Sequence, residues 1–267
     1  MGHTEWRFAS ATAIGTSHVK TGTPCQDHHR CRVFRNGADE PIIAIAVSDG
    51  AGSAAWGEDG AVITCASLIE QVELFLGQNR DLASITREDA HAWLDAVRKA
   101  IAEHASDAEH DMRDYACTML FALVGMDVAV FLQIGDGVIV VNDQAPEWSW
   151  VFWPHRGEFA NTTFFVTDAA AADHLRFEHS QGSIEEIALL SDGIEPLVLH
   201  YASRTIHAPF FNRMFGPVRR SIAVGEDLAI SRELESYLSS PAILQRTDDD
   251  KTLVLATRRQ QEVISSK

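Results

Sequence analysis

Pro41-Ile-Ile-Ala-Ile-Ala-Val-Ser-Asp-Gly50 is the stretch that decides the fold. Its apolar run is rich in β-branched residues and lies between a proline and a glycine, so it predicts a buried strand. Asp49 stands at the exit of this strand. Apolar residues then recur at helical spacing from Gly57 to about Gly77, which predicts an amphipathic helix that ends at a glycine.

The rest of the chain mixes blocks of strands with blocks of helices. Helical spacing returns from Glu88 to about His104, after a cap at Thr86, and again around Asp227–Leu238. Between residues 118 and 153, short β-rich runs separated by turn residues predict an antiparallel meander with strands at Met119–Val124, Val128–Ile134, Val138–Val141 and Trp148–Trp153. Further strands are expected at Thr163–Val166, Leu175–His179, Glu186–Leu190 and Thr252–Ala256.

This order indicates an α+β layered domain rather than an alternating parallel sheet. A chain of 267 residues can bury one sizeable core, and we expect a single domain over 1–267. Its core should span about 5–257, and the polar residues 258–267 should form a tail.

Charge and composition limit the partners. A formal net charge of −16 argues against binding nucleic acid or anionic membranes, which normally requires clustered Lys and Arg. The start lacks the pattern of a secretory signal, and no run of 18 apolar residues follows. The four cysteines are too few and too scattered for a disulfide framework. We therefore expect a soluble, cytoplasmic protein with free thiols.

Several aspartates share one local pattern. Asp49, Asp136 and Asp192 each follow an apolar strand and precede a glycine, and the run 248–250 comes just before the last strand. One Asp-Gly pair is commonly only a turn, but several at strand ends favour a shared site. Carboxylates gathered in one place repel one another unless a cation lies between them, and Mg²⁺ and Mn²⁺ prefer such oxygen ligands. The sequence therefore predicts a site for hard divalent cations.

Seven short motifs, spread over nearly the whole chain, occur together in an order that is typical of one protein family. They are Gly15-Thr-Ser-His18, Gly22-Thr-Pro-Cys-Gln-Asp27, Val47-Ser-Asp-Gly-Ala-Gly-Ser53, Gln133-Ile-Gly-Asp-Gly137, Gly157-Glu-Phe-Ala-Asn-Thr162, Leu190-Ser-Asp-Gly193 and Thr247-Asp-Asp-Asp-Lys-Thr252. In these motifs the chain resembles the metal-dependent protein phosphatases of the type 2C family, and a bacterial subgroup within it. The resemblance implies a four-layer αββα sandwich, in which helices flank two antiparallel β-sheets.

The resemblance also implies a ligand set for two Mn²⁺ or Mg²⁺ ions. Asp49 would bridge both ions, the Gly50 carbonyl would bind one, and Asp192 and Asp249 would bind the other. Asp136 falls where relatives hold a weaker third ion. A metal-bridging hydroxide would then attack the phosphorus of phosphoserine or phosphothreonine without a covalent enzyme intermediate.

The chain departs from the family around the substrate phosphate. Asp27 matches a supporting acid, but Gln26 precedes it where relatives often have another acid, and Gly22 replaces their phosphate-binding Arg. Candidates to hold the phosphate are His18, Lys20 and Arg156.

Two further positions bear on the substrate. Residues 157–163 could form a flap over the active site and would bring Glu158 and Asn161 to the substrate. Ala51 stands where some relatives carry a proton-donating His, so the leaving group would take its proton from elsewhere.

The leading hypothesis is a protein serine/threonine phosphatase. One alternative is a catalytically weak regulatory or binding module with the same fold, motivated by Gly22 and Gln26. Another is a hydrolase of a small phosphorylated metabolite. The resemblance also suggests a bacterial signalling set, with a kinase-like or von Willebrand A-type protein as a phosphorylated partner. We expect a monomer.

Overall fold

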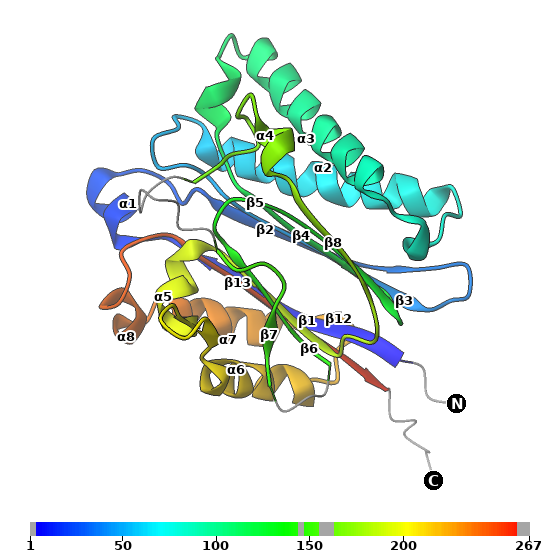
Figure 1. The fold of residues 1–267 in the computed structure, drawn as a ribbon. Coiled ribbons are helices and arrows are strands. Elements are labelled where there is room, and N and C mark those ends of the chain that lie inside the picture. Colours follow the sequence, from blue (N-terminus) through cyan, green and yellow to red (C-terminus); the bar gives the residue numbers. More distant parts are fainter. Residues whose placement is uncertain (1–3, 144–146, 155–162, 261–267) are drawn as a thin grey trace.

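The strand β3 (Pro41–Asp49) is buried on both faces because its alternate side chains enter two different cores. The odd-numbered side chains from Ile43 to Val47 pack between two sheets, and the even-numbered ones from Ile42 to Ala46 pack against helices. Two buried faces explain why the run is apolar throughout rather than alternating. The computed structural model describes residues 4–143, 147–154 and 163–260, and it places β3 inside a four-layer arrangement (Figure 1).

Five strands form the sheet that contains β3, and all of its pairings are antiparallel. Their order across the sheet is β2 (Asp27–Arg35), β3, β4 (Met119–Val124), β5 (Val128–Ile134) and β8 (Arg176–Gln181).

The second sheet has six strands and covers the inner face of the first. Their order is β12 (Gly225–Glu226), β1 (Thr4–Ala13), β13 (Lys251–Gln260), β9 (Glu186–Leu190), β6 (Val138–Asn142) and β7 (Ser149–Trp150). Only the short edge pair of β12 and β1 is parallel among the described strands. A separate two-stranded ribbon consists of β10 (Leu199–His200) and β11 (Thr205–Ile206).

Helices cover the outer faces of both sheets (Figure 1). The five-stranded sheet carries α2 (Gly57–Gly77) and α3 (Arg87–Asp107), and the six-stranded sheet carries α6 (Ala208–Arg220) and α7 (Leu228–Leu238). Shorter helical turns are α1 (Thr16–Thr21), η1 (Leu82–Ser84), η2 (Met112–Tyr115), α4 (Ala171–His174), η3 (Asp192–Ile194), α5 (Glu195–Val198) and α8 (Pro241–Leu244). The α+β, four-layer αββα prediction is confirmed.

The two long helices over the five-stranded sheet follow their sequence signals. Thr86 caps α3, and its hydroxyl and the Asp89 carboxylate form a reciprocal capping box. By length and composition alone, α2 could cross a membrane, but half of its most apolar window is buried, and it packs on β2 and β3. This is the environment of a core helix.

The predicted meander is wrong at its third strand. β4 and β5 pair, but β6 belongs to the other sheet, so Gly135-Asp136-Gly137 carries the chain from one layer to the next. Apolar patterning reports burial but not which sheet a strand joins, and the turn residues suit either route.

Several boundaries also differ. Residues 163–166 form no strand, and the predicted strand Trp148–Trp153 shortens to Ser149–Trp150. β13 continues to Gln260, and Arg258 is buried there because its guanidinium binds Glu185 and the carbonyls of Gly125 and Met126. The prediction that a polar tail begins at residue 258 therefore places the end of the last strand too early.

Shortening one inward side chain of β3 tests the sandwich core. Ile45 is fully buried between the sheets, so Ile45→Ala should lower the free energy of unfolding by about 2–5 kcal/mol. Urea denaturation followed by tryptophan fluorescence measures this. Val62, 39% exposed on α2, is the control, and Val62→Ala should stay within about 0.5 kcal/mol of wild type. Equal losses in both variants would contradict the assignment of Ile45 to the core.

Candidate functional site

Four aspartates from four chain segments meet at one end of the two sheets. Asp27 begins β2 and lies opposite Asp49 at the end of β3, so both belong to the five-stranded sheet. Asp192 follows β9 and Asp249 precedes β13, so both belong to the six-stranded sheet. A hydrogen bond of 2.7 Å from the Ser191 hydroxyl to the Asp27 carboxylate links the two layers directly.

Burial and mutual repulsion both act on these carboxyl groups. Burial raises the pKa of Asp49 well above its usual range, and the charges of Asp27, Asp192 and Asp249 raise it further. Burial also raises the pKa of Asp192 to about 8, reinforced by Asp136 and Asp249. These shifts show that the sequence-predicted aspartates influence one another across the two sheets. A cation placed among them would relieve the repulsion.

The site fits a hard divalent cation. Asp27 is buried, its Oδ2 accepts the Ser191 hydroxyl, and its Oδ1 is buried without a hydrogen-bond partner. Burial raises its pKa to about 6, against the effect of the Ser191 hydrogen bond. The surrounding donors are carboxylate and carbonyl oxygens, the ligands that Mg²⁺ and Mn²⁺ prefer.

Within the described ranges, no three acidic, histidine or cysteine side chains stand close enough to hold one ion by themselves. A bound cation would therefore complete its shell with backbone carbonyl and water oxygens, as Mg²⁺ usually does. The carbonyl of Gly50, a buried residue next to Asp49, is one such group on this loop.

Asp250 holds the loops around the aspartates together, a role that local sequence patterns do not indicate. Its Oδ1 accepts the Gly15 amide at 2.6 Å, and its Oδ2 accepts the Gln26 amide at 2.6 Å. His18 Nδ1 lies 2.8 Å from the same Oδ2. Such backbone-to-carboxylate hydrogen bonds across the fold carry no signal in a single sequence.

Lys251 is a second residue without a predicted role. Its side chain is fully buried, and its ammonium donates to the carbonyls of Ile14 and Asp249. Burial lowers its pKa, and the nearby carboxylates oppose this effect. The positive charge of the Lys251 ammonium, fixed at this position, offsets part of the negative charge of the aspartates.

Two glycines let the loops approach closely. A Cβ on Gly193 would lie 1.9 Å from the Asp250 carbonyl oxygen, and a Cβ on Gly50 would lie 2.5 Å from the backbone of Gly57. Any other residue would push these loops apart. Gln26 supports the same region, because its carbonyl accepts the Gly50 amide and its side chain donates to Ala54.

The remaining predicted residues have different surroundings. Asp136 contributes to the raised pKa of Asp192 and accepts the Thr163 hydroxyl. The Lys20 side chain is exposed on α1, with no hydrogen bond or ion pair to described residues. Gly22 ends α1 with a φ of 74°, a left-handed conformation that favours glycine over the Arg of relatives. Arg156, Glu158 and Asn161 lie outside the described residues, as does nearly all of the predicted flap.

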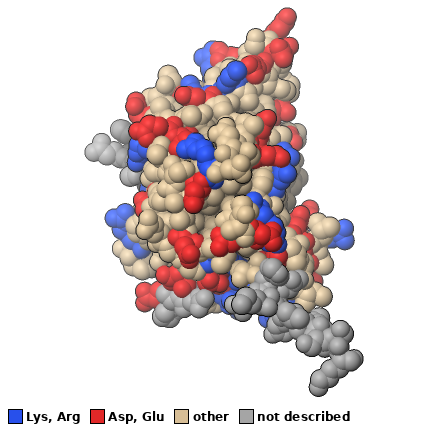
Figure 2. Space-filling view, turned by 90° about the vertical axis from the view of Figure 1, so that its right-hand side faces the viewer, with Lys and Arg blue, Asp and Glu red and all other residues tan. Residues whose placement is uncertain are grey.

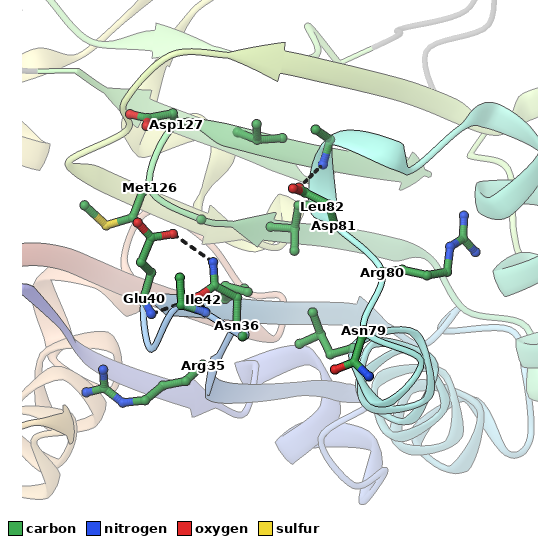
Figure 3. Close-up of a pocket in the computed structure, with 16 residues that line it drawn as sticks. Arg35, Asn36, Glu40, Ile42, Asn79, Arg80, Asp81, Leu82, Met126 and Asp127 are labelled. Atoms are coloured by element: carbon green, nitrogen blue, oxygen red, sulfur yellow. Dashed lines mark hydrogen bonds between the residues drawn. The ribbon is translucent and has the colours of Figure 1, made fainter.

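A large cavity lies at the opposite end of the sheets, between the β2–β3 turn, the end of α2 and the β4–β5 turn (Figure 3). It measures about 640 Å³ and none of the clustered aspartates lines it. Asn36 donates to Glu40, and Arg80 pairs with Asp89. Figure 2 shows acidic and basic side chains interspersed over this end of the molecule. This cavity and the predicted metal site therefore lie at opposite ends of the sheets.

Comparison with known proteins matches the geometry to a family. The family model described as "Protein phosphatase 2C" matches residues 14–239. Serine/threonine-protein phosphatase 3 of Escherichia coli K12 is 34% identical over 254 residues, which cover 94% of this chain and 98% of that protein. The chain belongs to the protein phosphatase 2C family.

Solved structures at lower identity share the fold of this phosphatase. A bacterial serine phosphatase aligns with a TM-score of 0.58 and 17% identity, over 98% of this chain and 100% of the other. The catalytic domain of PstP, solved with two manganese ions, aligns with a TM-score of 0.57 and 13% identity, over 96% and 99% of the two chains. Stp1 from Staphylococcus aureus aligns with a TM-score of 0.55 and 15% identity, over 96% and 95%.

Adding a methyl group at Gly193 tests the close approach of the loops. Gly193→Ala would place a Cβ against the Asp250 carbonyl, so the loops carrying Asp192 and Asp249 should separate. We expect Mn²⁺ affinity, measured by calorimetry, to fall by roughly 10–100-fold. The matched control is Gly37→Ala, because a Cβ there meets nothing within 4 Å. Unchanged affinity in a folded Gly193→Ala variant would show that the contact is dispensable.

The raised pKa of Asp192 predicts how stability depends on pH. Folding raises this pKa from its usual 3.8 to about 8, so the folded protein retains a proton that the unfolded chain releases. In EDTA, the contribution of Asp192 to stability should therefore fall as the pH rises from about 4 to about 8.

Urea titrations of wild type and Asp192→Asn measure this contribution. As the pH rises over that interval in EDTA, the free energy of unfolding of the variant should increase by at least about 1 kcal/mol relative to that of the wild type. Saturating Mn²⁺ should stabilise the wild type more at pH 8 than at pH 5. Parallel pH curves for the two proteins in EDTA would contradict the predicted repulsion.

Proposed function

We propose that the aspartates at the end of the two sheets hold two divalent cations and hydrolyse phosphoserine and phosphothreonine in proteins. The chain is a serine/threonine protein phosphatase of the 2C family. The observation that carries the proposed site is the convergence of Asp49, Asp192 and Asp249 from separate segments at one end of the two sheets, which the Ser191–Asp27 hydrogen bond joins there. Proteins gather buried carboxylates in this way where a cation neutralises them.

The proposed ligands divide between the two layers. Asp49 would serve both cations, the Gly50 carbonyl one of them, and Asp192 and Asp249 the other, so Asp49, Asp192 and Asp249 would have to move closer together when that ion binds. Asp136 would hold a weaker third ion next to Asp192. Mn²⁺ is the first ion to test, because the PstP catalytic domain was solved with two manganese ions, and Mg²⁺ suits the same oxygen donors. When bound, such a pair of cations acidifies water and neutralises the charge of a phosphoryl group.

Residues around the ligands hold them in place. Asp27 is fixed by the Ser191 hydroxyl, and the Thr118 hydroxyl accepts the Asp49 amide at 2.9 Å. Lys251 adds a buried positive charge against the Asp249 backbone. Such supporting contacts commonly set metal affinity and ligand orientation.

The substrate and the cellular setting extend this proposal. We propose a phosphorylated protein partner, such as a kinase-like or von Willebrand A-type protein, and a cytoplasmic location. All four cysteines are free thiols, which suits a reducing compartment. Comparing a phosphoprotein with nucleotide and sugar phosphates tests the substrate class.

Removing the shared ligand tests the function directly. Asp49→Asn should lower kcat/KM on p-nitrophenyl phosphate and on a phosphothreonyl peptide by roughly 10³-fold or more in millimolar Mn²⁺. EDTA should abolish the wild-type activity, and added Mn²⁺ should restore it. Asp95→Asn, on an exposed position of α3, is the matched control and should retain wild-type rates. A wild-type protein that binds Mn²⁺ but cleaves neither substrate would overturn the proposed function.

A further inference from the structure

His18 and Asp250 form a pair at the edge of the acidic cluster. His18 Nδ1 lies 2.8 Å from Asp250 Oδ2, and the Asp250 side chain is only 2% exposed. Two backbone amides, from Gly15 and Gln26, hold the same carboxylate in place. A carboxylate acceptor fixes the imidazole in the form that carries a proton on Nδ1, and it also fixes the orientation of the ring.

The other nitrogen of the ring is open. The His18 side chain is 14% exposed. Its Nε2 has no hydrogen-bond partner among the described residues, and it is not one of the buried polar atoms that lack a partner. Solvent therefore reaches Nε2. One nitrogen held by a buried carboxylate and the other open to solvent is the arrangement of a proton-transfer histidine.

His18 also lies beside the proposed metal ligands. Loss of solvent contact raises the pKa of Asp249, and the charge of His18 acts in the opposite direction. α1 carries His18 next to the loop at residues 248–250, because Ser17 bonds the Asp248 carbonyl through both its amide and its hydroxyl. The imidazole is thus tied to the loop that carries Asp249.

The leaving oxygen needs a proton donor, and the other side chains near the acidic cluster are poorly suited to this role. The leaving serine or threonine oxygen is a strongly basic alkoxide unless it is protonated as the bond to phosphorus breaks. Lys251 is fully buried and already donates to two carbonyls. Burial raises the pKa of the Cys25 thiol, and Ala51, after the Asp49-Gly50 pair, has no proton to give.

We propose that His18, oriented by Asp250, is the general acid that protonates the leaving serine or threonine oxygen. This inference rests on the proposed function. The oxygen of a water molecule bonds to phosphorus while the phosphorus–oxygen bond to the side chain breaks. The electron pair of the broken bond stays on the side-chain oxygen, which takes a proton from Nε2 of the doubly protonated His18 imidazolium, leaving a neutral ring whose remaining proton, on Nδ1, is donated to Asp250. The proton lost by the attacking water passes to solvent, and solvent returns one to His18. In this scheme His18 is a catalytic residue and Asp250 is a positioning residue.

A leaving-group comparison of His18→Asn with wild type tests this role. The Asn amide can replace Nδ1 as the donor to Asp250, but it has no counterpart of Nε2. On a phosphothreonyl peptide, kcat/KM should fall by about 10²-fold or more, the usual contribution of a general acid. On p-nitrophenyl phosphate, whose nitrophenolate leaves without a proton, the variant should stay within about 3-fold of wild type.

Controls separate this role from binding and folding. Val19→Ala, at a 61% exposed position of α1, should leave both rates unchanged. Mn²⁺ affinity and the unfolding midpoint of His18→Asn should match wild type.

Each contrary result points to a specific failure. Equal losses on both substrates, with Mn²⁺ affinity kept, would overturn the general-acid role and indicate phosphate binding instead. Equal losses together with weaker Mn²⁺ binding would show that His18 is structural. A wild-type protein inactive on both substrates would instead fail the proposed function itself.

For Asp250, the expected readout is the same selective loss. Asp250→Asn, if it folds and binds Mn²⁺ as wild type does, should also lose activity mainly on the peptide, because it no longer orients the imidazole. Full activity of a folded Asp250→Asn variant on the peptide would overturn the positioning role.

Discussion

Repulsion among buried carboxylates is the constraint around which one end of this phosphatase is organised. Asp27, Asp49 and Asp192 stay close because hydrogen bonds and tight backbone contacts hold their segments, not because they attract one another. Asp250 supplies much of this restraint through the Gly15 and Gln26 amides. The energy stored in the repulsion is returned when a cation binds. The fold thus prepares the site at some expense to its own stability.

Much of the fold could be predicted from hydrophobic periodicity. The burial of β3 and the bounds of α2 follow from patterns that are local in the sequence. The assignment of β6 to the second sheet could not be predicted, because the spacing of apolar residues is the same whichever sheet a strand joins. α6 was missed because Pro217 and its aromatic residues interrupt the usual helix signals. Arg258 is predicted to lie in a tail because a charged residue usually indicates exposure, and the buried ion pair that it forms with Glu185 cannot be recognised in the sequence.

The site divides in the same way. The Asp-Gly pairs at strand ends identified Asp49, Asp136 and Asp192, since the signal lies in adjacent residues. The partners that position these aspartates come from distant segments, and Ser191 bonds Asp27 across 164 positions of the chain. From the sequence, Gly22 shows only that the Arg of relatives is absent. The structure shows that Gly22 ends α1 with a backbone in the left-handed conformation. Tertiary contacts and backbone conformation at this level are not encoded in local spacing.

The division of the proposed ligands between the two sheets has a consequence for the lifetime of the protein. Asp49 belongs to one layer and Asp192 and Asp249 to the other, so cations held by this set would join the layers as well as serve the chemistry. A ligand bound only to the folded form stabilises it by about 2.7 kcal/mol at a hundred times its dissociation constant. Proteases act on the unfolded fraction, so the supply of divalent metal in the cell would set how long each molecule survives as well as how fast it works.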